Sequence, residues 1–572
     1  MSQPDLVLLH PPSVYDFRQK TILYGPVSDV VPSSPVFEMY PIGFASIADY
    51  LERAGYQVRI INLAMRMLNN GEFDAEKMIK HLNSPLFGID LHWLVHAHGA
   101  IEVAKLVKQC HPKAKVVLGG LSSSYYYQEL MQYPDIDYVV RGDSAEEPLR
   151  QLIDCVKREV EPEAVPNLVW RDNQSGVREN NFSHVPSDLS NVMINHYGKI
   201  IRSVIRYRDL ASYIPFKGWM RYPIMAVFTC RGCTENCVIC GGSAAVFRGF
   251  YNRRERVVFR SPELVVQDIK QIARFSGGPI FLIGDLRQPG EDYSREVLRM
   301  IQQAGVKNQF MLELFTPAPG NFLRQVSQSC PNFCLQISPD SHDPKVRKAA
   351  GKHYSNEDLE QTLGDALDAG CGRLDIFFII GLPKQTQQSV MENIDYCDYL
   401  LKKFDGDKRL SLFIAPLAPF LDPGSLGFEQ PERYGYHILF RTLEEHRQSL
   451  LAPNWKYTLN YETDWMTRQQ IVETTYEAIL RLTRLKAKYG LISKKAAETA
   501  EQRILASLKM LRRIDDILSR DDNRQEELSR LKAEIDQINM LPASEKRELE
   551  LPIGLIKLKP WRALWSLMTT RR

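Results

Sequence analysis

The chain has 572 residues and a mass of 65.7 kDa, too long for one hydrophobic core, so two to four domains are expected. Hydrophobic residues make up 44% and charged residues 25%, which excludes a wholly disordered or collagen-like chain. Lys and Arg total 72 against 69 Asp and Glu, a balance that predicts no nucleic-acid partner. Since neither a signal peptide nor an apolar run of about 18 residues is evident, we expect a cytoplasmic protein.

Residues 1–160 alternate apolar strands with helical patterns, which predicts a doubly wound, Rossmann-like parallel sheet. Such sheets bind ligands at the carboxyl ends of their strands, where this chain places His92, the pair Gly119-Gly120 and the run Arg141-Gly142-Asp143. By itself, a glycine pair equally predicts a simple tight turn. The predicted strands are 6–9, 58–61, 87–90, 115–118 and 137–140, and the predicted helices are 43–53, 74–82, 99–109, 126–131 and 145–157.

Residues 161–220 have weaker periodicity and are predicted to form a connector with some strand. Residues 221–430 resume the alternation, and six strand–helix units predict a partial or complete parallel barrel of the (β/α)6 TIM-like kind. Its working face is expected at the carboxyl ends of the strands. The predicted strands are 224–228, 279–283, 309–315, 333–338, 373–380 and 410–415, and the predicted helices are 262–275, 292–304, 356–369 and 389–403.

Residues 431–572 are predicted to be helical, with a helical hairpin packed on the barrel. Their last segment, 551–572, carries five Lys or Arg, no acidic residue, and Trp561 and Trp565 among aliphatic residues. That composition predicts peripheral contact with the inner face of a membrane. Docking on the protein's own body is an equal alternative. The hairpin is predicted from two apolar stripes at helical spacing: Ile504, Leu508, Leu511 and Leu518, and Leu528, Leu531, Ile535 and Ile538.

Four of the ten cysteines fall between Cys230 and Cys240, directly after the first predicted barrel strand. Four thiolates at this spacing can form a closed tetrahedral zinc site, and thiolates are equally the ligands of iron–sulfur clusters. Spacing alone does not decide between the two. The position does favour a reactive cofactor, because the loop lies on the expected working face, where a structural zinc ion has no need to be.

The pattern Cys233-x3-Cys237-x2-Cys240 resembles the signature of radical S-adenosylmethionine enzymes. The resemblance implies a 4Fe-4S cluster held by these three cysteines, with one iron left open for S-adenosylmethionine. The run Arg231-Gly232-Cys233 is similar to the form found in members with an N-terminal cobalamin-binding domain, although Thr234-Glu235 replaces the usual Pro-Tyr. Cys230 lies outside the pattern and is interpreted as a non-ligand.

The same resemblance implies a binding site for S-adenosylmethionine across the barrel. Ile239, which replaces an aromatic residue of the family pattern, is expected against the adenine. Gly284-Asp285, after the second strand, is expected to pair with the methionine ammonium group. Glu313 and Ser338, after the third and fourth strands, are expected at the ribose or the carboxylate, and each is equally consistent with a local turn contact. Arg347 is a further candidate for the carboxylate or, alternatively, a solvated charge.

Residues 1–160 resemble the cobalamin-binding domain of this family, through Gly119-Gly120 and the Arg141-Gly142-Asp143 run. Asp90-Leu91-His92 is similar to a motif whose histidine ligates cobalt. However, Val95 replaces its glycine and the run follows the third strand instead of the first. We therefore predict that cobalamin binds without a histidine from that motif. The alternative is that His92, His96 or His98 approaches the cobalt from another direction.

The resemblance implies a cobalamin-dependent methyltransferase that acts on an unactivated carbon of a small-molecule or lipid substrate. One S-adenosylmethionine would supply the methyl group through cobalt and a second would supply the radical. An external electron donor of the flavodoxin or ferredoxin type is implied. Cyclisation, rearrangement or oxidation by the same domain pair is the alternative, and a methylthiotransferase or a non-catalytic corrinoid protein is a more distant one.

Overall fold

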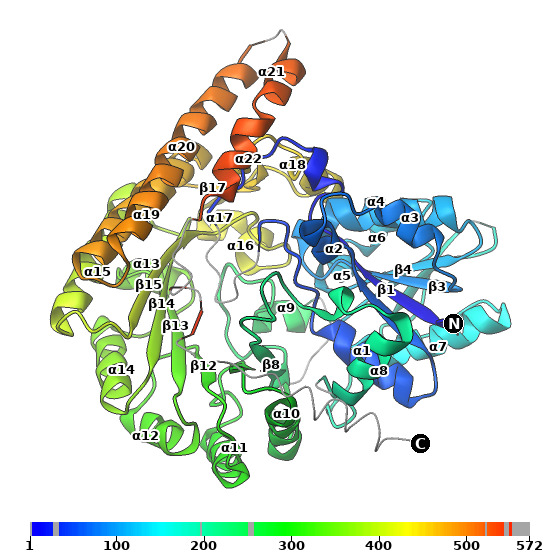
Figure 1. Cartoon of the computed structure of the whole chain (residues 1–572), viewed down its shortest axis with the longest axis horizontal. Helices are drawn as coiled ribbons and strands as arrows, with labels where there is room; N and C mark the ends of the chain where they lie inside the picture. Colours follow the sequence, from blue (N-terminus) through cyan, green and yellow to red (C-terminus); the bar gives the residue numbers. More distant parts are fainter. Residues whose placement is uncertain are drawn as a thin grey trace.

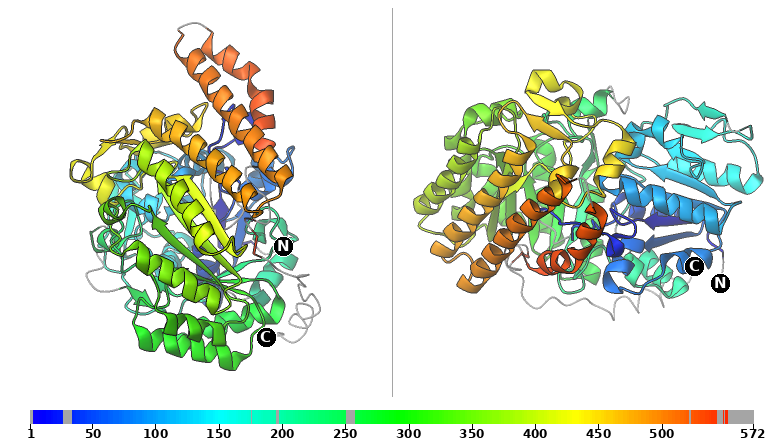
Figure 2. Two further views of the ribbon diagram at one scale, coloured as in Figure 1. Left: turned by 90° about the vertical axis from the view of Figure 1, so that its left-hand side faces the viewer. Right: turned by 90° about the horizontal axis from the view of Figure 1, so that it is seen from above.

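The computed structural model contains two α/β bodies side by side, with a pair of antiparallel helices projecting from one of them (Figure 1). Viewed from above, the C-terminal helices lie against the barrel and reach toward the N-terminal body (Figure 2). The structure describes residues 3–26, 34–174, 176–194, 197–249, 257–520, 523–542, 548 and 550–551.

The N-terminal body is built on a seven-stranded sheet in the order β2-β1-β3-β4-β5-β6-β7. Strands β1 to β5 are parallel, and the order 2-1-3-4-5 puts a topological switch point between β1 and β3. This confirms the predicted doubly wound sheet. Its elements are β1 Leu6–His10, α1 Gly43–Arg53, β2 Val58–Asn62, α2 Leu63–Asn69, α3 Ala75–Lys80, β3 Leu86–Asp90, α4 Ala97–Cys110, β4 Lys115–Gly119, α5 Leu121–Tyr125, α6 Tyr127–Leu130, β5 Tyr138–Val140 and α7 Glu146–Arg158.

The sheet continues beyond residue 160, the predicted end of the first domain. Strands β6 (Leu168–Arg171) and β7 (Val177–Glu179) add antiparallel strands next to β5. The first is buried along most of its length, and the Asp172 side chain stabilises the turn by accepting hydrogen bonds from the N–H groups of Gln174 at 2.9 Å and Gly176 at 2.7 Å. Part of the predicted connector thus belongs to the first sheet. Helix α8 (Tyr197–Tyr207) lies further along the connector.

The second body is an open barrel of six parallel strands in the order β8-β11-β12-β13-β14-β15. All six strands lie where the sequence predicts them. Three helices, α9, α12 and α13, were not predicted. The elements are β8 Met225–Phe228, β9 Cys230–Arg231, α9 Ala244–Gly249, β10 Val258–Phe259, α10 Pro262–Phe275, β11 Ile280–Ile283, α11 Glu291–Ala304, β12 Phe310–Leu314, α12 Gly320–Ser329, β13 Cys334–Asp340, α13 Pro344–Ala349, α14 Asn356–Asp368, β14 Arg373–Ile380, α15 Gln387–Lys403 and β15 Leu410–Pro416.

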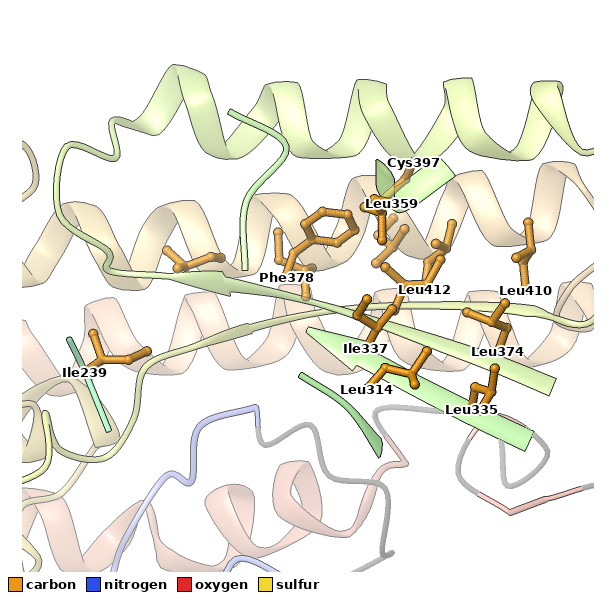
Figure 3. Packing of buried hydrophobic residues seen from close by; sticks show 14 of the residues in the cluster. Ile239, Leu314, Leu335, Ile337, Leu359, Leu374, Phe378, Cys397, Leu410 and Leu412 are labelled. Atoms are coloured by element: carbon orange, nitrogen blue, oxygen red, sulfur yellow. The ribbon is translucent and has the colours of Figure 1, made fainter. Parts of the chain in front are cut away.

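Alternation along the barrel strands separates the packed core from the barrel interior. In β14, Leu374, Ile376 and Phe378 belong to the main buried cluster, together with residues of the surrounding helices (Figure 3). The residues between them, such as Asp375 and Phe377, face the other way because successive side chains of a strand point to opposite sides. The barrel interior is therefore lined by a second, more polar set of side chains.

The region after the barrel confirms the predicted helical hairpin but also contains an unpredicted strand pair, β16 (Tyr436–Ile438) with β17 (Tyr461–Thr463). Helix α19 lies against α15 and β15, and α20 packs on α19. Leu531, Ile535 and Ile538 are buried, as an apolar stripe requires. The helices are α16 Leu426–Glu429, α17 Pro431–Tyr434, α18 Leu443–Ser449, α19 Arg468–Lys488, α20 Lys494–Leu518, α21 Arg524–Arg530 and α22 Lys532–Met540.

The described end of the chain returns to the amino-terminal end of the barrel strands. Leu551 is buried there with Phe216 and Tyr222, and its N–H donates to the Tyr222 hydroxyl at 3.2 Å. Arg373 donates to the carbonyl oxygens of Glu548 and Glu550. The segment thus docks on the protein's own body up to Leu551, whereas the rest of the predicted membrane-contact segment, 552–572, lies outside the described residues. Within the described helices, none combines the length and apolar character needed to cross a bilayer.

Candidate functional site

The three cysteines of the predicted cluster signature lie in a loop at the carboxyl end of β8. We call residues 230–243 the cluster loop. It begins with β9, which pairs antiparallel with β10. Two sulfur atoms accept backbone hydrogen bonds: Glu235 N–H donates to Cys233 Sγ over 3.4 Å, and Gly242 N–H donates to Cys240 Sγ over 3.3 Å. Such bonds stabilise thiolate sulfur and tune the potential of a bound cluster.

Close backbone contacts hold the cluster loop in place. Val238 N–H donates to the Ala350 carbonyl at 3.0 Å, and Gly427 N–H donates to the Val238 carbonyl at 2.9 Å. Gly351 has a φ of +98°, and a Cβ atom on it would lie 2.7 Å from the Asn236 carbonyl oxygen. Only glycine fits there without displacing the loop. Segments after β13 and β15 therefore fix the loop from two sides.

The donor set of the cluster loop fits an iron–sulfur cluster. Burial raises the pKa of Cys233 and of Cys240 to about 12, so both thiols stay protonated until a metal charge stabilises the thiolates. Three cysteine thiols in one loop supply the soft sulfur donors that an iron–sulfur cluster prefers. Cys230 points elsewhere, with its sulfur 3.5 Å from the Gly232 carbonyl oxygen.

The structure brings Gly284 and Glu313 together inside the barrel. Gly284 N–H donates to Glu313 Oε2, and Gln336 Nε2 donates to Glu313 Oε1 at 2.7 Å from the neighbouring strand. Gly284 has a φ of +93°, and a Cβ atom there would lie 2.7 Å from Thr229 Oγ1. Gln336 Oε1 is buried without a partner among the described residues. The Glu313 carboxyl and the unpartnered Gln336 Oε1 thus lie together, and a ligand hydroxyl could donate a hydrogen bond to them.

Loss of hydration raises the pKa of Glu313 to about 7, although its hydrogen bonds oppose the shift. A raised carboxyl pKa stabilises the folded state, and this stabilisation is complete when the pH is below the unfolded pKa of about 4.5. The contribution, roughly 3 kcal/mol in all, is lost as the pH rises through about 7. The thermal unfolding midpoint of the cofactor-free protein should therefore fall between pH 5 and pH 8 more steeply in the wild type than in Glu313→Gln. Equal slopes would contradict the assignment.

Two of the predicted ligand contacts, the acidic Asp285 and the basic Arg347, already bind other groups of the protein. Arg287 donates from Nε to Asp285 Oδ1 at 2.9 Å, and Phe315 N–H donates to Asp285 Oδ2 at 2.9 Å. Arg347 is fully buried and donates to the Ser341 carbonyl at 2.8 Å and the Tyr354 carbonyl at 2.9 Å. Arg347 is thus neither a solvated charge nor open to a carboxylate, because it satisfies the turn after β13. Asp285 follows the second barrel strand, but its carboxylate is already paired with Arg287.

Sequence reasoning missed Lys352, which follows Gly351 at the cluster loop. Its Nζ donates to Asp340 Oδ1 at 2.9 Å and to the Ser338 carbonyl, and its side chain is only 13% exposed. Burial raises the pKa of Cys237, and the Lys352 charge is the largest opposing influence. An ammonium group therefore lies close to a predicted cluster ligand. A single lysine in a short loop gives no sequence signal of this kind.

Ser338 and Ile239 are the remaining predicted contacts of S-adenosylmethionine in the barrel. Ser338 is half-buried in β13 and faces the barrel interior with its main-chain oxygen bound to Lys352. Ile239 is buried in the main apolar cluster and is set apart from its other labelled members (Figure 3). The predicted contacts of Ser338 with ribose and of Ile239 with adenine stay predictions.

In the N-terminal body, the histidines after β1 and β3 share one carbonyl. His10 Nε2 lies 3.1 Å and His96 Nε2 lies 2.9 Å from the Phe37 oxygen, so both nitrogens must donate. The other nitrogen of His96 is then unprotonated, and it has no partner among the described residues. Burial lowers the pKa of His96 to about 4, which keeps the ring neutral. His10 also contacts Asp90, with 2.9 Å between Nδ1 and Oδ1.

The predicted cobalamin-binding residues Gly119, Gly120 and His92 meet where β3 and β4 end. Gly120 has a φ of +118°, and a Cβ atom there would lie 2.5 Å from His92 Cα. The Ser122 N–H donates to the His92 carbonyl at 3.2 Å. His98 instead accepts a hydrogen bond from Tyr15 N–H at 3.2 Å. Gly120 thus allows the turns after β3 and β4 to touch, which a glycine pair alone did not reveal.

The comparisons with known proteins agree with this architecture. Residues 29–153 match the B12 binding domain family model, and residues 227–397 match the Radical SAM superfamily model. A hopanoid C-3 methylase of Methylococcus capsulatus is 24% identical, over 48% of this chain and 47% of its own length. A cytidylyl-2-hydroxyethylphosphonate methyltransferase of Streptomyces wedmorensis is 23% identical, over 50% of this chain and 59% of its own. The chain thus spans about half the length of the curated relatives it matches.

Solved structures share the fold. The methyltransferase TsrM from Kitasatospora setae, with cobalamin and a [4Fe-4S] cluster bound, matches with a TM-score of 0.53 and 15% identity over 77% of this chain and 81% of its own. The enzyme OxsB, with aqua-cobalamin and S-adenosylmethionine bound, matches with a TM-score of 0.51 and 13% identity over 94% of this chain and 72% of its own. Fold and site define a radical S-adenosylmethionine protein with a cobalamin-binding domain. Residues 29–153 and 227–397 give this chain the domain pair of the cobalamin-dependent radical S-adenosylmethionine enzymes, a B12-binding domain followed by a radical S-adenosylmethionine domain.

Proposed function

We propose that this protein transfers a methyl group from S-adenosylmethionine to an unactivated carbon of a small-molecule or lipid substrate. The observation that carries the proposal is the three-thiol cluster loop at the mouth of the barrel, in contact with the cobalamin-binding body. When bound, the cluster would supply the electron that cleaves S-adenosylmethionine, and cobalamin would supply methyl-carrying cobalt. The names of the two curated relatives support methylation.

In this proposal, Cys233, Cys237 and Cys240 hold the cluster, and the barrel residues orient S-adenosylmethionine. Gln336 Oε1 and Glu313 would accept hydrogen bonds from the ribose hydroxyls. Lys352, rather than Arg347, would bind the methionine carboxylate, because its ammonium lies beside the cluster loop.

The methionine ammonium group needs an acceptor close to the cluster loop. The carboxylate of Asp285 lies at the end of β11 but is partly neutralised by Arg287. Glu313, which is bonded to Gly284 N–H, is the other acceptor at that end of the barrel. Because Glu313 is proposed for the ribose, we propose that Asp285 accepts the methionine ammonium group and that Ile239 lies against the adenine.

For the N-terminal body, we propose that the turns after β3 and β4 bind cobalamin, with Gly119, Gly120 and His92 at its edge. The unpartnered ring nitrogen of His96 is a second group available to the cofactor. An electron donor of the flavodoxin or ferredoxin type would reduce the cluster. We also propose that the basic segment 551–572 permits peripheral contact with the inner face of a membrane, which would suit a lipid substrate.

The decisive experiment is anaerobic incubation of the reconstituted protein with cobalamin, a reductant and S-adenosylmethionine. Methyl transfer requires that one S-adenosylmethionine leave as S-adenosylhomocysteine and a second as methionine and 5′-deoxyadenosine. Both nucleoside products should therefore appear in a chromatographic assay. Deoxyadenosine alone would support a cyclisation or rearrangement, and neither product, with both cofactors present, would overturn the proposal.

A further inference from the structure

A buried ion pair joins the cluster loop to the cobalamin-binding body. Arg231, in β9, donates from Nη1 to Glu146 Oε2 at 3.1 Å and from Nη2 to Glu146 Oε1. Glu146 opens α7, directly after the turn that follows β5. The two side chains are only 13% and 7% exposed. This two-pronged geometry fixes both the distance and the relative orientation of the groups it joins.

Neighbouring side chains complete the contact. Ser144 Oγ accepts a third bond from Arg231 Nη1 at 2.9 Å, and Ser46 Oγ of α1 donates to Glu146 Oε1 at 2.8 Å. Burial alone would raise the pKa of Glu146, but the Arg231 guanidinium holds it below its ordinary value. The pair is therefore charged on both sides and anchored to two helices of the N-terminal body.

The position of Arg231 connects this contact to the chemistry. It lies two residues before Cys233, and its backbone is fixed by pairing with Val258. Glu146 lies on the loop–helix junction after β5, the strand next to β4 in the sheet, and the turns after β3 and β4 are the ones proposed to bind cobalamin. Some other polar contacts of the N-terminal body, such as Tyr125 Oη to Glu429 Oε1 at 2.6 Å, involve the segment after the barrel, and others, such as Lys199 Nζ to Asp49 Oδ1 at 2.9 Å, involve the connector.

We propose that the Arg231–Glu146 pair is a positioning device that sets the distance between the iron–sulfur cluster and cobalamin. The inference rests on the proposed function, because it needs both cofactors to act on one substrate. Displacement of a reacting group by about 1 Å can cost 100-fold in rate. A bidentate link next to the first cluster ligand limits such displacement, whereas contacts remote from the loop do not.

The test uses holoenzyme of Glu146→Gln, which keeps the shape and the Ser46 bond but loses the charge. Glu147→Gln is the matched control, because Glu147 is the next residue of α7 and pairs with Arg150 of its own helix. Pulsed electron paramagnetic resonance between the reduced cluster and Co(II) cobalamin measures the distance between the cofactors. Wild type and Glu147→Gln should give one narrow distance distribution, and Glu146→Gln a broader or shifted one, with unchanged iron and cobalamin content.

The product assay gives a second readout. S-adenosylhomocysteine formation needs both cofactors and should fall at least about tenfold in Glu146→Gln, whereas 5′-deoxyadenosine formation needs only the cluster and should stay within about twofold. Arg231→Lys, which keeps the charge with a single-pronged donor, should fall between wild type and Glu146→Gln. An unchanged distance distribution, or equal loss of both products, would overturn the proposal.

Failure to fold has its own control. The neutral pair Arg231→Met with Glu146→Gln contains no unpaired buried charge, so it should hold both cofactors even if the single variant does not. If this double variant also loses them, the ion pair is a stability element and the proposal is wrong. If the wild type shows a narrow distribution of distances between the cofactors but forms neither product, the proposed function is wrong. The distance distributions of the variants still test whether the ion pair positions the cofactors.

Discussion

Replacement of Cys237 by alanine is expected to remove the iron–sulfur cluster and to lower 5′-deoxyadenosine formation more than about 100-fold. Loss of a ligand should cost more than the 10- to 100-fold effects of outer-shell changes. The variant should still bind cobalamin, because the N-terminal sheet does not depend on the cluster loop for its strand pairing. Iron and acid-labile sulfide analysis, cobalamin absorbance and product chromatography measure the three quantities.

Cys230→Ala is the matched control for that experiment. Cys230 lies three residues before Cys233, but its sulfur contacts the Gly232 carbonyl and the Gln288 side chain. Burial raises its pKa to about 11, as it does for its neighbours, so the difference between the variants reports ligation rather than acidity. The control should keep its iron. Loss of iron in Cys230→Ala, or its retention in Cys237→Ala, would contradict the three-cysteine assignment.

Much of the fold was predictable because strand–helix alternation and burial on one face leave clear patterns. The six barrel strands are short apolar runs separated by helices with an apolar stripe, and all six were placed correctly. The pair β6 and β7 was harder to assign. An antiparallel hairpin at a sheet edge has the same local pattern whether it caps the first sheet or begins a connector. Its pairing with β5 depends on distant residues.

The site was predictable where a motif fixes several residues at once and not where partners are chosen in space. Three cysteines in one loop predict a shared ligand. Arg347 and Lys352 are both basic residues after β13, and sequence reasoning named Arg347 and missed Lys352. The turn carbonyls of Ser341 and Tyr354 engage Arg347 fully, which leaves Lys352 beside the cluster loop. The contact of Asp285 with Arg287 joins residues only two positions apart, so it is more local in sequence than the contacts of Arg347 and Lys352.

Replacement of Lys352 by methionine should weaken S-adenosylmethionine binding about 10- to 100-fold, because a charged hydrogen bond contributes roughly 1.5–3 kcal/mol. It should also destabilise the protein by about 3–5 kcal/mol, since Asp340 would be left buried and unpaired. Equilibrium dialysis with labelled S-adenosylmethionine and thermal unfolding measure the two effects. Lys348→Met, at an exposed lysine of α13, the helix that ends three residues before Lys352, should change neither.

The two effects of Lys352→Met separate in a second variant. Adding Asp340→Asn removes the unpaired carboxylate, so stability should largely recover while binding stays weak. Arg347→Met should show the opposite behaviour, because it leaves buried turn carbonyls without a donor but removes no proposed ligand contact. Folded Arg347→Met should bind S-adenosylmethionine like the wild type. Weak binding in Arg347→Met, together with normal binding in the Lys352 double variant, would instead assign the methionine carboxylate to Arg347. In that case the buried guanidinium would have to leave its turn when S-adenosylmethionine binds.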